Sequence, residues 1–497
     1  MAYVHSERLS ALDASFLAIE DGTSHMHIGA VAIFEAAPLR GVHGGIDFDR
    51  VMALMEAGIH RVPRYRQKLA WTPVFGQPVW IDDPHFNLHY HVRHTHLPRP
   101  GDARQLKRMA GRLMSQELDR GKPLWEMWVV EGLEGDRFAI VTKAHHCMID
   151  GVGSVELTSS VMRPTPDPDP RLLEPPPRWV PRPAPSLLQL FLDELAHRAA
   201  TPVRVARLVR DRIAEPLAGL AAAGAAAAGV MEAVGAGLAP ASATPFNQPV
   251  GPHRRFDWTV SDLLAVRRIR DRFGGTLNDV VLAVLSGALG RFLHRRGIAV
   301  DGLDFRAMLP VNVRTAATRQ HVGNQVAMIV ARLPLAERDA RMRLAQVSQE
   351  TQRAKRSHQA LGMQVIEELS DWTSTSLLSQ FARLTAMSRP YNLIVTNVPG
   401  PPFPVYVAGA RMLACYPLVP LFENQTLGVA LFSYDGRLHW GFNADWDGLP
   451  DLHELVEAVE LEMATLRTAA DGAEPPAVDG EAEAATGLDR GGEREAS

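Results

Sequence analysis

Residues 138–157 read FAIVTKAHHCMIDGVGSVEL, and this stretch organises the interpretation of the whole chain. The short apolar run 138–141 predicts a buried strand. His145 and His146 follow this run after three further residues. From residue 152 onward, apolar and polar positions recur at helical spacing. The two histidines are therefore predicted to lie at a turn between a strand and a helix.

Histidine at such a turn suits proton transfer, because its unperturbed pKa is the closest of all side chains to neutrality. Adjacent side chains at a strand end point apart, so one ring should face a substrate while the other packs inward. Asp150 either pairs with the inward ring or an arginine, or caps the following helix, and we favour a structural role. A His-His pair alone is a weak signal in a chain with 19 histidines.

The bulk composition describes a globular protein with more than one core. A chain of 497 residues predicts two domains of roughly 200 residues each. Residues 470–497 hold eight acidic and two basic side chains, so the net charge of −4 leaves a body near +2. This body gives no case for nucleic-acid binding. Two cysteines, and an N-terminus without a signal-peptide pattern, indicate a cytoplasmic protein.

Composition also marks the boundaries between domains. Ten prolines between residues 163 and 185 predict a stiff spacer. The leucines from residue 187 onward, followed by arginines, predict either a helix packed on the domains or one lying on a membrane or lipid-droplet surface. The Ala- and Gly-rich stretch 217–239 predicts a linker, since Glu232 interrupts it. We expect an N-terminal half over 1–162, a Pro- and Ala-rich linker over 163–245, a C-terminal half over 246–468 and a disordered acidic tail over 469–497.

Four short motifs stand in a fixed order along the chain. They are Pro-Leu-Trp at 123–125, HHxxxDG at 145–151, Asn-Asp at 278–279 and NVPGP at 397–401. LSALDASFL near the start and RVPRYRQKL some fifty residues later accompany them. Together they resemble the bacterial wax ester synthase/diacylglycerol acyltransferase family. The HHxxxDG spacing is similar to that of the chloramphenicol acetyltransferase-like and condensation-domain acyltransferases.

The resemblance covers roughly residues 5–468 and implies both a fold and a reaction. The implied fold is α/β (α+β), with two chloramphenicol acetyltransferase-like halves that each contain a mixed sheet and helices. The implied reaction moves a long acyl chain from acyl-coenzyme A to diacylglycerol or a long-chain alcohol, without a covalent intermediate, a cofactor or a metal. A chain of about sixteen carbons gains on the order of 10 kcal/mol from burial, so a deep apolar channel is expected.

The resemblance also assigns roles within the central motif. His146 is the general base, which takes the proton of the alcohol and later protonates the departing thiolate. His145 supports it, Asp150 orients the turn, and Gly151 completes the motif. Cys147 offers a competing nucleophile with His146 as its base, but adjacent side chains at a strand end usually point apart.

Three further residues have both a functional and a structural interpretation. Asn278 would stabilise the oxyanion, with Asp279 beside it. The alternative for this pair is an ordinary helix start, with Thr276 or Asn278 near the cap and an acidic residue in the first turn. Trp125 either walls the acyl channel or is a core tryptophan at the start of a strand.

Other function classes remain as alternatives at this point. One is a condensation-type enzyme with a carrier-bound donor or another acceptor, and another is a non-catalytic lipid-binding or droplet-coating protein. Five histidines between residues 85 and 96 raise the question of a metal site. We favour a half-exposed strand there, because residues 89–92 alternate and no HExxH motif is present.

The remaining periodicity predicts the other elements. Helices are expected at 48–60, 105–118, 276–291, 338–357, 376–387 and 450–466; strands are expected at 27–34, 127–133, 305–311, 325–333 and 391–398; and a hairpin over 427–443 should turn at 435–436.

Overall fold

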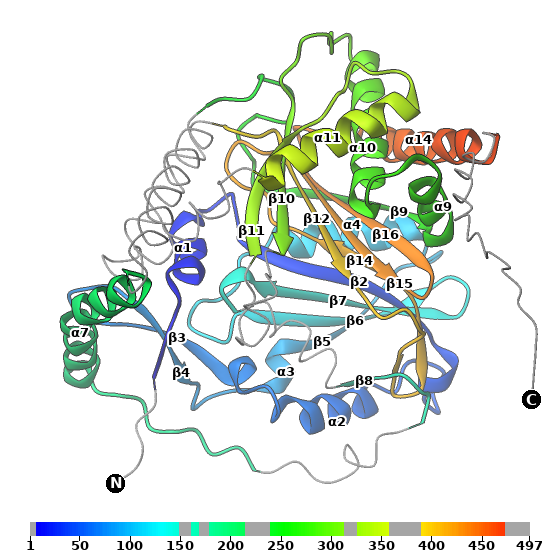
Figure 1. Ribbon diagram of the computed structural model, residues 1–497. Helices are drawn as coiled ribbons and strands as arrows, with labels where there is room; N and C mark the ends of the chain where they lie inside the picture. Colours follow the sequence, from blue (N-terminus) through cyan, green and yellow to red (C-terminus); the bar gives the residue numbers. More distant parts are fainter. Residues whose placement is uncertain are drawn as a thin grey trace, which may run out of the picture.

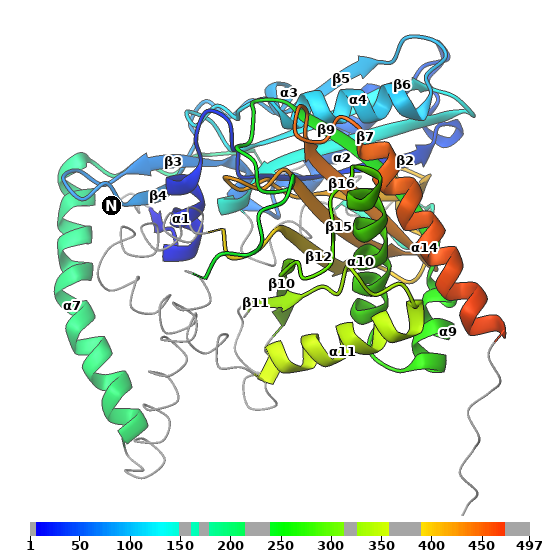
Figure 2. The same ribbon diagram turned by 90° about the horizontal axis from the view of Figure 1, so that it is seen from above.

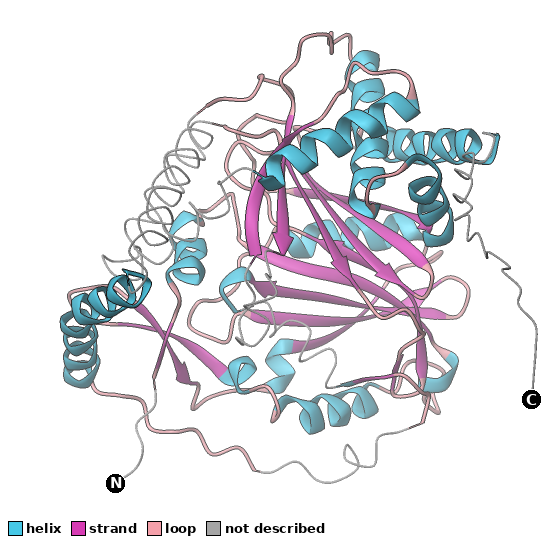
Figure 3. Cartoon of the chain, viewed as in Figure 1, coloured by secondary structure: helices cyan, strands magenta, loops and turns pink. Residues whose placement is uncertain are grey.

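The computed structural model describes residues 6–148, 161–167, 178–213, 239–312, 326–356 and 389–472. Two large mixed sheets, one small sheet and the surrounding helices make up these residues (Figure 1, Figure 3). The small sheet has the order β1-β4-β3, with β1 at Glu7–Arg8, β3 at Gln67–Trp71 and β4 at Pro78–Asp82. The mixed α/β architecture expected from the sequence is present.

The seven-stranded sheet has the order β5-β6-β7-β2-β14-β13-β8, in which only β5 and β6 run parallel. Its strands are β2 (His27–Glu35), β5 (Val92–His96), β6 (Trp125–Leu133), β7 (Arg137–His145), β8 (Met162–Arg163), β13 (Tyr406–Val407) and β14 (Ala410–Leu418). The register pairs His27 with His145, so the start of β2 lies beside the end of β7.

The six-stranded sheet has the order β11-β10-β12-β15-β16-β9, with parallel pairing of β10 to β12 and of β12 to β15. Its strands are β9 (Arg254–Asp262), β10 (Arg306–Asn312), β11 (Val326–Arg332), β12 (Leu393–Pro399), β15 (Leu427–Tyr434) and β16 (Arg437–Asp445). The predicted hairpin turns at Asp435 and Gly436, which both have positive φ (44° and 76°) as a two-residue turn of this kind requires.

The helices divide between the two large sheets. They are α1 (Ala11–Ile19), α2 (Phe48–Ile59), α3 (Leu88–His91), α4 (Ala103–Met114), α7 (Leu187–Ile213), α9 (Leu263–Phe273), α10 (Leu277–Arg295), α11 (Ala340–Arg356) and α14 (Leu452–Gly472), with 3-10 turns η1 (Ala37–Leu39), η2 (Pro63–Arg66) and η3 (His146–Met148). Helices α9, α10, α11 and α14 gather on one side of the six-stranded sheet, whereas α7 stands apart from both sheets (Figure 2).

The apolar run that opens the central motif is buried on both faces of its sheet. Phe138 and Ile140 pack into the cluster that contains α2, whereas Ala139 and Val141 pack toward α4 and β9. All four side chains are buried. A strand covered on both sides needs apolar residues at every position, which explains a run without alternation.

The two halves interlock through one segment that the sequence division did not anticipate. Strands β13 and β14 follow β12 in the chain, yet β14 pairs with β2 of the first half. Helix α4 packs against β9 of the second half, where a Cβ on Gly111 would lie 2.6 Å from the carbonyl oxygen of Arg254. The close approach therefore requires glycine at this position.

Several sequence expectations differ from the structure. Residues 88–91, predicted as strand, form the single helical turn α3, because the Asn87 side chain accepts the backbone N–H of His89. The strand begins only at Val92. The helices predicted after residue 152 and at 376–387, the stretch 217–238 of the Ala-rich linker and the tail beyond residue 472 lie outside the described residues.

Helix α10 illustrates how a long apolar helix serves as a core element. Among the described helices, it alone is long and apolar enough to cross a membrane, and 78% of that stretch is buried inside the protein. Thr276 caps it, and Thr276 and Asp279 exchange hydrogen bonds in a capping box. Its burial against α11, α14 and the sheet accounts for its composition.

Candidate active site

The two histidines of the central motif diverge at the end of β7, as predicted. His145 is the last residue of the strand and is 1% exposed. His146 opens the 3-10 turn η3 and is partly exposed. Its ring stacks on Phe16 of α1, with centroids 3.9 Å apart and planes inclined by 27°. Of the two residues, His146 is the less buried.

Burial sets the protonation state of His146. The pKa of its imidazole is lowered to about 4, mainly because burial disfavours the charged ring and also because of the charge of His145. The ring is therefore neutral at pH 7 and can accept a proton. Its Nδ1 atom has no hydrogen-bond partner among the other described residues.

Backbone hydrogen bonds fix the turn to two neighbouring segments. The N–H of His145 donates to the carbonyl of Leu124 (2.9 Å), and the N–H of His146 donates to the carbonyl of Met26 (2.7 Å). Leu124 belongs to the Pro-Leu-Trp motif. This motif thus supports the turn from one side, and the start of β2 supports it from the other.

His145 has a defined tautomer because its two ring nitrogens have different partners. Nδ1 accepts the backbone N–H of Cys147 at 3.1 Å, so the proton resides on Nε2. Nε2 donates to the Glu20 carboxylate at 3.2 Å, and Arg120 donates to the same carboxylate oxygen at 2.6 Å. Burial by itself would raise the pKa of Glu20, but the hydrogen bonds that His145 and Arg120 donate outweigh it and lower the pKa to about 2.

The sequence did not predict the buried carboxylate of Glu20. It also did not predict the residues around that carboxylate, namely Arg120, His25 and His27. The pKa of His27 is lowered well below its usual range, first by burial and then by the charge of Lys143. The chain carries two histidines at alternating positions around the start of β2, at 25 and 27, shortly after an acidic pair at 20 and 21. That pattern was the available signal.

Cys147 is a buried thiol and not an exposed nucleophile. Its side chain is 3% exposed, and burial raises the pKa of the thiol well above its usual range. A thiol in that state supplies almost no thiolate at pH 7. Asp150 and Gly151, the remaining members of the motif, lie outside the described residues.

Trp125 occupies the core at the start of β6. It is 2% exposed, its Nε1–H donates to the carbonyl of Tyr65 (2.9 Å), and its ring stacks on His91 at 4.7 Å. These contacts account for a tryptophan at this position as a packing residue. Contact with an acyl chain stays a prediction.

Asn278 and Asp279 have different surroundings although they are adjacent at the start of α10. Asn278 is exposed, and its Oδ1 accepts a hydrogen bond from Nδ2 of Asn397 at 2.7 Å. Asn397 belongs to the NVPGP motif. Asp279 is buried and accepts from the Thr276 backbone and from the Thr351 hydroxyl (2.7 and 2.6 Å). Asp279 therefore acts as a helix cap, and Asn278 is the residue presented outward.

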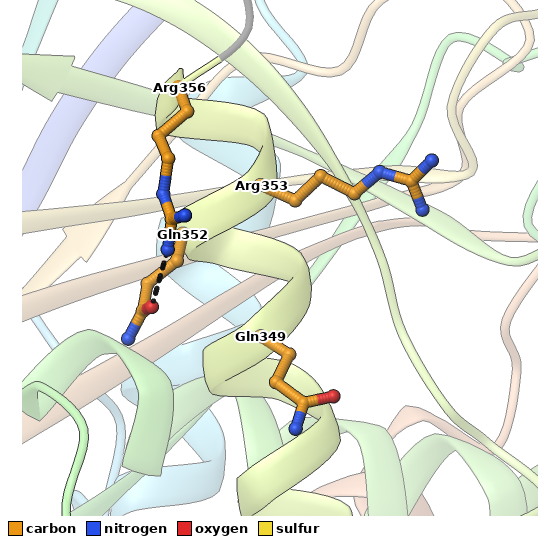
Figure 4. A pocket seen from close by; sticks show the side chains of 4 residues that line it. All are labelled: Gln349, Gln352, Arg353 and Arg356. Carbon is orange, nitrogen blue, oxygen red and sulfur yellow. Dashed lines mark hydrogen bonds between the residues drawn. The ribbon is translucent and has the colours of Figure 1, made fainter.

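Two hollows are formed by the described residues of the second half. One lies under the Asn278–Asn397 pair, has apolar walls that include Leu309, Ile329 and Val395, and has room for about one water molecule (about 20 Å³). The other is a surface hollow of about 420 Å³ on α11, lined by Gln349, Gln352, Arg353 and Arg356 (Figure 4). Neither is a deep apolar channel, so that channel stays a prediction.

Among the described residues, no group of three or more His, Cys, Asp or Glu side chains has the arrangement of a metal site. Three of the five histidines between 85 and 96, namely His91, His94 and His96, have hydrogen-bond partners for their rings. His91 contacts the carbonyl of Trp125 through Nδ1 at 2.8 Å, and His94 pairs with Glu131.

Family models match both parts of the chain. The model described as "Wax ester synthase/diacylglycerol acyltransferase catalytic domain" matches residues 9–281, and the "WS/DGAT C-terminal domain" matches residues 322–467. A "Putative diacyglycerol O-acyltransferase" of Mycobacterium tuberculosis (strain ATCC 25618 / H37Rv) is 33% identical over 462 residues, which cover 90% of this chain and 87% of that protein.

Solved structures show the same fold. The wax ester synthase/diacylglycerol acyltransferase from Marinobacter aquaeolei VT8 superimposes with a TM-score of 0.66 at 24% identity, over 94% of this chain and 100% of that chain. A starter condensation domain of rhizomide synthetase superimposes with a TM-score of 0.54 at 16% identity, over 95% and 97% of the two chains. The chain therefore belongs to the wax ester synthase/diacylglycerol acyltransferase family of enzymes and has a fold related to condensation domains.

Proposed function

We propose that this chain transfers a long acyl group from acyl-coenzyme A to the hydroxyl of diacylglycerol or of a long-chain alcohol. The observation that carries the proposal is the neutral ring of His146, a partly exposed residue directly after β7, in a family of this activity. No covalent enzyme intermediate is part of the mechanism.

His146 acts first as a base and then as an acid. Its neutral ring takes the hydroxyl proton while the alcohol oxygen attacks the thioester carbonyl, which forms a tetrahedral oxyanion. When the oxyanion collapses, the carbon–sulfur bond breaks and the imidazolium protonates the thiolate of coenzyme A. General base and acid assistance of this kind contributes typically about 10² to 10⁴ in rate.

Asn278 supplies a donor for the oxyanion in this proposal. Its Oδ1 already accepts from Asn397, which orients the side chain and directs its NH₂ group away from that contact. An amide N–H held in one orientation can stabilise developing negative charge without reorganisation. Asp150 orients the motif, as the sequence predicts.

Two alternatives have less support. A Cys147 nucleophile would need a thiolate, and the raised pKa of this buried thiol opposes one. The second alternative is an acyl donor bound to a carrier, which the relation of the fold to condensation domains suggests. However, the starter condensation domain of rhizomide synthetase was solved in complex with C8-CoA, which supports an acyl-coenzyme A donor on this fold.

Water-insoluble acceptors suggest contact with a lipid surface. Helix α7 exposes four leucines near its start, and their exposed fractions are 71% for Leu187, 66% for Leu188, 50% for Leu192 and 47% for Leu195. Exposed leucines on one helix suit a peripheral contact with a membrane or lipid droplet. We propose a cytoplasmic enzyme that collects acceptors at such a surface.

The test is thiol release from palmitoyl-coenzyme A by purified protein, with hexadecanol, with dipalmitoylglycerol and without acceptor. We expect release that depends on the acceptor and that the His146→Ala variant lacks. Product identification by mass spectrometry ranks the two alcohols. Absence of release with both alcohols would overturn the acceptor assignment, and an active His146→Ala variant would overturn the mechanism.

A further inference from the structure

We propose that Glu20 is a positioning residue for His146 and that it acts through the tautomer of His145. The inference rests on the proposed function, because it concerns the same proton transfer. Glu20 lies directly after helix α1, 125 residues before His145 in the chain. Its side chain is 3% exposed.

The Glu20 carboxylate is surrounded by hydrogen-bond donors on both oxygens. Oε2 accepts from Nε2–H of His145 at 3.2 Å and from Arg120 at 2.6 Å. Oε1 accepts the backbone N–H of Met26 at 3.2 Å, and Nε2 of His27 lies 3.6 Å away from it. An ionised carboxylate only accepts hydrogen bonds, so it can accept from His145, Arg120 and the Met26 N–H at the same time.

The tautomer that Glu20 selects is the one that the turn requires. Because Nε2 of His145 carries the proton, Nδ1 is free to accept the N–H of Cys147. That bond links the last residue of β7 to the residue after His146. Met26, whose N–H binds Glu20, also receives the N–H of His146 through its carbonyl. Glu20 therefore constrains the backbone on both sides of the base.

An amide at position 20 would keep the shape of the side chain, but it could no longer accept hydrogen bonds at both of its terminal atoms. In either orientation, the NH₂ group of the substituted side chain would face donors, namely His145 and Arg120 or the Met26 N–H. His145 could relieve the conflict by moving its proton to Nδ1, but Nδ1–H would then oppose the N–H of Cys147. Glu20→Gln thus changes hydrogen-bond polarity at nearly constant volume.

The experiment compares Glu20→Gln with a matched variant at another buried carboxylate. Asp82→Asn is the control, because Asp82 is also buried, also pairs with an arginine (Arg182, 2.7 Å) and also has a pKa lowered to about 2 by that arginine against the effect of burial. We expect Glu20→Gln to lower kcat by about 10²-fold, as a displaced catalytic group does, with KM for palmitoyl-coenzyme A within about twofold. Asp82→Asn should lower the unfolding temperature and leave kcat unchanged.

A second variant tests the path through His145. His145→Asn places an amide oxygen near the position of Nδ1, where it can still accept the Cys147 N–H, and removes the donor to Glu20. In that background, Glu20→Gln should lower kcat by no more than about threefold further, because the His145 donor is gone and the substituted amide can still turn its oxygen toward the Met26 N–H.

The outcomes separate this inference from the proposed function. A wild-type protein without acyl transfer to either alcohol overturns the function and leaves no kcat to compare. An active wild type whose kcat survives Glu20→Gln overturns the positioning role. Equal losses of kcat in Glu20→Gln and Asp82→Asn also overturn it, because they indicate a general loss of folding. A double variant whose loss of kcat equals the product of the losses in Glu20→Gln and His145→Asn would exclude the path through the tautomer of His145.

Discussion

The end of β7 in the first half and the start of α10 in the second half surround their candidate functional residues with different kinds of partner. At the end of β7, His146 follows His145, whose ring donates to the buried carboxylate of Glu20, and Arg120 donates to the same carboxylate. At the start of α10, Asn278 contacts another amide, that of Asn397. In the proposed mechanism, the first region moves a proton, whereas the second holds a neutral donor in place.

The difference has a physical cause. A base must change its charge during the reaction, so its surroundings have to set its pKa and its tautomer. A hydrogen-bond donor for an oxyanion changes nothing in itself, so orientation by one amide partner suffices. The comparison predicts that variants in the first region affect the chemical step more strongly than variants in the second.

The largest expected effect is that of His146→Ala. Its loss of kcat is compared with that of Asn278→Ala, to test whether the first region contributes more to the chemical step than the second. His146→Ala should lower kcat by about 10²–10⁴-fold, because it removes the base. Asn278→Ala should lower it by about 10²-fold or less, as one oxyanion donor does. Steady-state thiol release measures both, and unfolding temperature is the control. A larger loss for Asn278→Ala would reverse the comparison.

Asp279→Ala asks whether the buried neighbour of Asn278 takes part in chemistry. The variant removes the acceptor of the Thr276 backbone N–H and one of the two acceptors of the Thr351 hydroxyl, which keeps the Ser348 carbonyl at 3.1 Å. We expect a loss of about 1–2 kcal/mol in the free energy of unfolding, measured with urea, since half of the capping box and one buried hydrogen bond are lost. The kcat of the folded fraction should stay within about threefold, and a loss beyond about 30-fold would assign Asp279 to the reaction.

Acidification should destabilise both halves through buried neutral histidines. Burial lowers the pKa of His146 and of His439 to about 4, and that of His27 well below its usual range. The unfolded chain therefore binds protons below pH 6.5 that the folded protein does not. Stability should fall as the pH falls from 6.5 toward 4, by about 1.4 kcal/mol per pH unit for each such histidine.

Unfolding measured in urea at pH 7.5, 6.0 and 5.0 checks this slope. The His439→Asn variant should reduce the slope of unfolding free energy against pH by the contribution of one histidine, about 1.4 kcal/mol per pH unit. An unchanged slope would show that His439 does not contribute. Below pH 4.5 the loss should steepen, because the pKa of Glu20 is lowered to about 2 and its stabilising contribution is present only while it stays ionised.

The smallest expected effect is that of Cys147→Ala, which separates general base catalysis from a covalent route. The buried thiol has a raised pKa, and the contact of this residue with His145 uses only its backbone N–H. We expect kcat within about threefold of the wild type and a stability loss of about 1 kcal/mol. Loss of activity comparable to that of His146→Ala would establish Cys147 as the nucleophile.

Local sequence was sufficient for features that depend on neighbours in the chain. The run 138–141 identified β7, Thr276 and Asp279 identified the start of α10, and Asp435 with Gly436 identified a hairpin turn. Each depends on periodicity, capping or turn chemistry within a few residues. The divergence of His145 and His146 followed for the same reason, because side-chain direction at a strand end is a local property.

Contacts between distant segments were decided by the tertiary structure alone. The pairing of β14 with β2 joins two segments from opposite ends of the chain, and the strand pattern of β14 contains no information about its partner. Glu20 reaches His145 across 125 positions, and Asn397 reaches Asn278 across 119. Spacing therefore predicted two histidines at a strand end, and the family resemblance supplied the proposed role of His146 as a base. Only the packing of the sheets decided which carboxylate sets the tautomer of its neighbour, because hydrogen-bond partners are chosen by proximity in space.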